Sequence, residues 1–69
     1  MRQVTSLTDL YNLAAKDERY SKLLIISAEN LGGVINSQED AIRHLEMNAD
    51  AMGERDVLGE VNFCLDLVE

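Results

Sequence analysis

The chain has 69 residues, a formal net charge of −7 at pH 7, 46% hydrophobic residues and a single cysteine. At this length we expect one domain over residues 1–69, and one cysteine excludes an internal disulfide framework. No apolar run approaches the roughly 18 residues of a membrane span, and we see no secretory signal. We therefore expect a cytoplasmic protein with no membrane contact. Direct nucleic-acid binding is also disfavoured, because affinity for phosphates requires a basic footprint.

The composition favours helices. There is no proline, and the chain holds ten leucines and six alanines but only three aromatic residues. Strand-rich domains prefer β-branched and aromatic residues instead. We therefore predict a small all-α domain of three or four helices, at roughly residues 6–16, 18–31, 37–52 and 55–68. A small α+β fold, with strands near 22–27 and 60–68, is the alternative.

The first predicted helix carries apolar residues at helical spacing, at Leu7, Leu10, Tyr11 and Ala14. Thr5 or Ser6 can cap its start, and Asp9 adds a carboxylate to the first turn, where the helix dipole favours it. The segment Met1–Thr5 is expected to be frayed. The apolar stripe loses its phase after Ala14, which predicts a turn or kink at Lys16–Glu18.

The segment 19–31 contains the longest apolar run and is expected to organise the fold. Its helical stripe consists of Tyr20, Leu23, Leu24, Ala28 and Leu31. Ile25 and Ile26 widen the apolar arc to roughly 260°, so the helix must be covered on more than one side. Gly32 and Gly33 are expected to end it, because glycine adopts positive φ without penalty.

The third predicted helix starts at a capping signal, Ser37-Gln38-Glu39-Asp40, and stops at Gly53. Its expected inward stripe is Ile42, Leu45, Ala49 and Met52. Its expected outward stripe is Glu39, Arg43, Glu46 and Asp50.

The last segment is the most ambiguous. As a helix it carries a six-member stripe, Val57, Leu58, Val61, Cys64, Leu65 and Val68. As a strand it alternates with Val61, Phe63, Leu65 and Leu67 on one side, and Gly59 and Asn62 weaken the helix. The longer stripe favours the helix. Phe63 and Leu67 then lie off the stripe in an exposed apolar patch, which predicts a homodimer that buries them.

The charge is unevenly placed. Residues 1–33 hold four basic and four acidic side chains, whereas residues 34–69 hold two basic and nine acidic ones. A solvated surface explains such a charge, but so does an anionic face that meets a basic partner protein. On the second interpretation Glu39, Glu46 and Asp50 form the partner-binding ridge.

We find no motif for catalysis, for a metal or for a cofactor. His44 has no matching acid, base or nucleophile at a recognisable spacing, and residues 56–69 offer no Lys or Arg to activate Cys64. Gly32-Gly33 lacks the longer glycine pattern and lysine of a phosphate loop. The sequence thus predicts a non-enzymatic protein-interaction module, an adaptor or an inhibitor. The sharper form is an inhibitor of the basic site of a nucleic-acid-binding protein, and the alternative is a structural subunit of a larger assembly.

Overall fold

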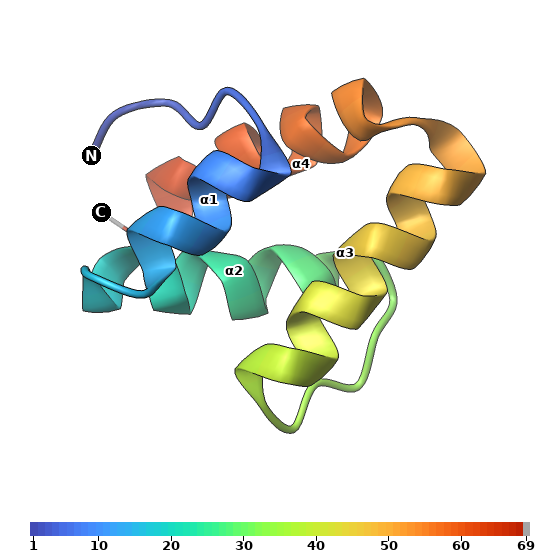
Figure 1. Ribbon diagram of the computed structural model, residues 1–69, viewed down its shortest axis with the longest axis horizontal. Coiled ribbons are helices and arrows are strands. Elements are labelled where there is room, and N and C mark those ends of the chain that lie inside the picture. Colours follow the sequence, from blue (N-terminus) through green and yellow to red (C-terminus); the bar gives the residue numbers. More distant parts are fainter. Residues whose placement is uncertain (69) are drawn as a thin grey trace.

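Four α-helices form the computed structural model, which describes residues 1–68 (Figure 1). They are α1 (Leu7–Ala14), α2 (Glu18–Asn30), α3 (Gln38–Met52) and α4 (Glu54–Val68). The predicted all-α fold is confirmed. The alternative strands are wrong, because residues 22–27 lie in α2 and residues 60–68 lie in α4. None of the helices in residues 1–68 is long and apolar enough to cross a membrane.

The central element is α2, which packs against α1, α3 and α4. Tyr20, Leu23 and Leu24 are buried between these neighbours, and Ile25 and Ile26 are half-buried against the same core. The wide apolar arc of this helix is therefore covered by the chain itself. The expectation that this helix is covered on more than one side is met by α1, α3 and α4, with Ile25, Ile26 and Leu31 left half-buried.

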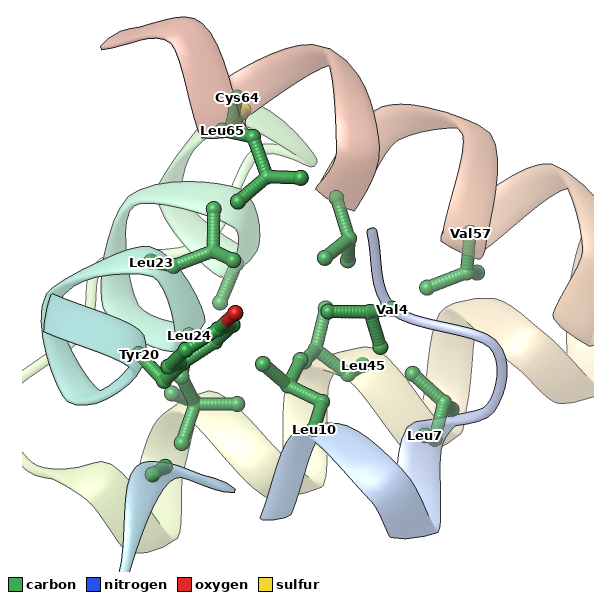
Figure 2. Packing of buried hydrophobic residues seen from close by; sticks show 14 residues of the cluster. Val4, Leu7, Leu10, Tyr20, Leu23, Leu24, Leu45, Val57, Cys64 and Leu65 are labelled. Atoms are coloured by element: carbon green, nitrogen blue, oxygen red, sulfur yellow. The ribbon is translucent and has the colours of Figure 1, made fainter. Parts of the chain in front are cut away.

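The hydrophobic core receives side chains from all four helices, as Figure 2 shows. Leu10, Leu23, Leu45 and Val57 come one from each helix and are fully buried. Burial of each such side chain is worth about 1.5–3 kcal/mol, which makes this cluster the main stabilising feature of a small domain.

The N-terminal segment is docked, so the expectation of a frayed start at Met1–Thr5 is wrong. The backbone N–H of Val4 donates to Oδ1 of Asn62 at 2.8 Å, and Nδ2 of Asn62 donates to the Val4 carbonyl oxygen at 3.0 Å. The Tyr20 hydroxyl likewise accepts from the Arg2 backbone N–H at 2.9 Å and donates to the Arg2 carbonyl oxygen at 3.1 Å. With its backbone held at two places, the segment places Val4 in the core, 3% exposed.

The helix starts lie where the capping residues predict them. Ser6 Oγ accepts from the Asp9 backbone N–H at 2.9 Å, and Ser37 Oγ accepts from the Asp40 N–H at 3.2 Å. Asp17 caps α2 by accepting from the Arg19 N–H at 2.9 Å. Hydrogen bonds from Arg19 hold the pKa of the Asp17 carboxyl below its usual value.

At the end of α2, glycine occupies two consecutive positions for different physical reasons. Gly32 has φ +97°, and its N–H donates to the Glu29 carbonyl while the Gly33 N–H donates to the Ala28 carbonyl, a Schellman ending. Gly33 is needed for space, since a Cβ there would lie 2.7 Å from Cδ2 of His44.

The inward face of α3 differs from the predicted stripe at both ends, because it includes Ala41, which the stripe leaves out, and excludes Met52. Ala41 and Leu45 are fully buried, whereas Met52 is 41% exposed. The expectation that Met52 points inward is therefore wrong. Met52 is the last residue of α3, and at Gly53, with φ +96°, the chain turns away toward α4 at the edge of the molecule (Figure 1).

Candidate functional site

The predicted partner-binding residues share the outer face of α3. We call Glu39, Glu46 and Asp50 the acidic ridge, and all three are exposed. Arg43 lies on the same face and is the single Lys or Arg of this helix. Its Nη1 lies 3.1 Å from Oδ1 of Asp40, so a fourth carboxylate offsets its charge. The ridge therefore presents a negative surface.

The middle of the ridge lies near the phenol of Tyr11 on α1. The buried Tyr11 hydroxyl lies close to the Glu46 carboxylate, although within residues 1–68 this contact does not reach ordinary hydrogen-bond geometry. Burial is the largest cause that raises the pKa of Tyr11 above its usual range, and the negative charge of Glu46 is the next. Glu54 also contributes to this shift. The Glu54 carboxylate accepts from the Leu7 N–H at 2.9 Å, so an acidic side chain of α4 caps the first turn of α1.

The predicted self-association residues lie on the outer face of α4. We call Phe63 and Leu67 the apolar pair, and they are 66% and 61% exposed. They stand one helical turn apart. Gly59 lies one turn before Phe63 on the same face and is also exposed. The structure thus places the acidic ridge and the apolar pair on different helices.

The sequence analysis missed the roles of two residues, one beside the acidic ridge and one that holds the N-terminal segment. Met47 is 60% exposed and lies on α3 beside the ridge, three positions before Asp50. Its position outside the predicted inward stripe was the available signal. Asn62 was interpreted only as a weak helix former, although its amide holds the Val4 backbone. No pattern along the chain indicates that contact.

His44 and Cys64 are part of the packing. Nδ1 of His44 lies 3.0 Å from the Asp40 carbonyl oxygen, and the ring covers Gly33. Cys64 is fully buried, with its Sγ 3.1 Å from Nδ2 of Asn30. In residues 1–68 there is neither a pocket nor a group of three or more His, Cys, Asp and Glu side chains that could hold a metal ion.

No protein-family model, curated protein or solved structure matches this chain. Function must therefore be argued from the two exposed surfaces.

Proposed function

We propose that this chain is a non-enzymatic protein-interaction module, an adaptor or inhibitor that binds a basic partner protein through the acidic ridge. The observation that carries the proposal is the exposure of Glu39, Glu46 and Asp50 on one helix face, where the only cation is already paired. Complementary charge across an interface mainly raises the association rate and selects the partner.

The sharper form of the proposal is an inhibitor that occupies the basic site of a nucleic-acid-binding protein. Glu39 and Asp50 are eleven positions apart, so the ridge extends roughly 16 Å along α3. A line of carboxylates of this length can meet a row of Lys and Arg side chains that otherwise contacts phosphates. On this proposal the chain binds no nucleic acid itself and works in the cytoplasm, where its partner is present.

Charge reversal on the ridge tests the proposal once affinity capture and mass spectrometry have supplied a partner. We expect the double variant Glu46→Lys/Asp50→Lys to lower the association rate about tenfold or more and to reduce its salt dependence. The matched control is Glu18→Lys/Glu29→Lys, which makes the same change in net charge at exposed positions of α2. Equal rates for wild type and ridge variant at low and high salt would show that the ridge is only a solvated face.

A second candidate is self-association through the apolar pair, which would make the protein a homodimer or a structural subunit of a larger assembly. The exposure of Phe63 and Leu67 is the observation that favours it. Sedimentation equilibrium at micromolar concentration tests this candidate. A mass of 7.7 kDa at every concentration contradicts the dimer, and an unchanged dimer mass in Phe63→Asp shows that a different surface is used.

A further inference from the structure

The outer face of α4 has no cover in the described part of the chain. Phe63 and Leu67 stand at i and i+4, so their side chains form one continuous apolar surface. The buried stripe of the same helix, which includes Val57, Val61 and Cys64, faces the core. An exposed apolar patch that is surrounded by polar residues marks an interaction site.

Gly59 extends this surface by one helical turn, and glycine is an unusual residue inside a helix. Glycine in a helix interior costs stability, and here φ is not positive and no described atom lies within 4 Å of a Cβ built at this position. Residues 1–68 therefore supply neither a backbone nor a packing reason for glycine. The missing side chain leaves the α4 backbone uncovered one turn before Phe63, so the backbone of another helix can approach α4 closely there.

The charges around the apolar pair indicate which kind of partner can bind the outer face of α4. Glu60 and Asp66 lie on this helix beside the pair and Asp56 lies beside Gly59, whereas Arg55 is the single Lys or Arg of α4. In a two-fold dimer of α4 faces both copies present the same patch, so six carboxylates, three from each copy, would meet only the two Arg55 side chains, which leaves a net charge of −4 around the contact. Like charges at such a contact oppose association, whereas a basic segment complements them.

We propose that the outer face of α4 docks an amphipathic helix of a partner protein, one whose apolar stripe is flanked by Lys and Arg. The stripe covers Phe63 and Leu67, the helix backbone approaches at Gly59, and the flanking cations meet the carboxylates. This inference rests on the proposed function, since both require a basic protein partner. It adds the docking face and the chemistry of the partner segment.

The probe is a synthetic fluorescein-labelled helical peptide of about 18 residues, with leucines on one face and lysines on both flanks. Fluorescence anisotropy is measured against the full chain. We expect saturable binding that weakens as salt is added. A peptide with the leucines replaced by serine keeps the charge, and one with the lysines replaced by glutamate keeps the apolar stripe. Both should bind about tenfold more weakly or worse, because the face needs both features.

Two variants assign the binding to α4. Phe63→Ser removes the apolar anchor, and Gly59→Gln covers the exposed backbone at position 59 with the side chain of a good helix former. Each should weaken peptide binding about tenfold or more. Gly59→Gln should melt at the same or a higher temperature than wild type, so its loss of binding is not unfolding. Val34→Ser is the matched control, because Val34 is 83% exposed outside α4 and should leave binding unchanged.

Three results would overturn the inference. If Glu46→Lys/Asp50→Lys abolishes binding while Phe63→Ser and Gly59→Gln do not, the peptide docks on the acidic ridge, and the proposed function stands without the α4 face. If the chain sediments as a dimer that Phe63→Asp dissociates, a second copy covers the face. If wild type does not bind the peptide, the α4 face has no affinity for this chemistry, and the ridge is still tested separately against the captured partner.

Discussion

At the scale of single residues, buried hydroxyl groups show where this small core is imperfect. Ser27 is fully buried in α2, and within residues 1–68 its Oγ has no hydrogen-bond partner, while the buried Tyr11 hydroxyl has only a contact with the Glu46 carboxylate outside ordinary hydrogen-bond geometry. A buried polar atom without a partner loses its hydration and receives nothing in return. These two positions are therefore where a conservative substitution should have a measurable and readily interpreted effect.

We predict that Ser27→Ala raises the free energy of unfolding by about 1 kcal/mol, because it removes the unsatisfied hydroxyl and introduces a better helix former. The melting temperature should rise by about 4–8 °C in a domain of this size. Ser21→Ala is the control, since the Ser21 hydroxyl already accepts a hydrogen bond from Gln38. A loss of stability in Ser27→Ala would mean that the hydroxyl is paired in solution.

We predict a distinctive alkaline response from Tyr11. Its folded-state pKa is raised above the ordinary value of 10.0, so ionisation is opposed in the folded protein but free in the unfolded chain. The folded state then holds more protons above about pH 10, and stability falls as the pH rises through this range. The free energy of unfolding, measured with urea at about pH 8 and about pH 11, should fall less between these two pH values in Tyr11→Phe than in wild type. Equal falls in both proteins would contradict the prediction.

At the scale of elements, the helices are joined by contacts between residues far apart in the sequence. The Asn62 amide pairs with both backbone groups of Val4, 58 positions away, and so joins the N-terminal segment to α4. The Glu54 carboxylate caps α1 at Leu7, 47 positions away. Each contact uses a polar side chain of α4 to satisfy a backbone group that has no partner in its own element.

We predict that Asn62→Ala destabilises the protein by about 2 kcal/mol, because two backbone groups of Val4 lose their partners. Hydrogen exchange at the Val4 amide should become much faster than in wild type. Asn48→Ala is the control, since Asn48 donates to the His44 carbonyl within its own helix, α3. Unchanged exchange at Val4 would show that its burial in the core, without Asn62, holds the segment.

We predict that replacing glycine by alanine changes the free energy of unfolding in opposite directions at positions 59 and 32. Gly59→Ala should raise the free energy of unfolding by about 1 kcal/mol, because position 59 is helical and has open space around it. Gly32→Ala should lower it by about 1 kcal/mol, because position 32 has φ +97° and a Cβ is strained there. Thermal melting of the two variants measures both. If both variants were more stable than wild type, or both less stable, the roles assigned to the two glycines would be contradicted.

At the scale of the whole molecule, a net charge of −7 is carried on a domain with a radius of gyration of 10.4 Å. Like charges at such separations repel across the surface at low ionic strength and are screened at physiological salt. Within the described residues the ion pairs are few and exposed, and pairs of this kind contribute little. We therefore expect self-repulsion to oppose folding more than these pairs favour it.

We predict that the melting temperature rises as NaCl increases from about 0.01 M to about 0.3 M, because the Debye length falls from about 30 Å to well under 10 Å. Glu46→Lys/Asp50→Lys lowers the negative charge and should show a smaller rise. A melting temperature that falls with salt would mean that attractive pairs outweigh repulsion.

The sequence by itself determined the helices, because helix formation depends on residues within a few positions of one another. Ser6, Asp17 and Ser37 cap the N–H groups two or three positions ahead, and Gly32 and Gly53 supply positive φ at the helix ends. Helical periodicity likewise identified the exposed faces. The acidic residues opposite the stripe of α3 and the apolar pair of α4 are exposed as periodicity predicts, although Ser27 and Ala41, which lie outside the predicted stripes, are fully buried.

Tertiary structure alone decided what covers each face and what holds the N-terminus. Val4 is buried through a contact with Asn62, the arc of α2 is covered by three other helices, and Met52 is exposed because the chain turns at Gly53. Periodicity indicates which side of a helix is apolar but not where along its length the neighbouring helices end. That information lies in long-range packing, in which each partner is specified by distant parts of the chain.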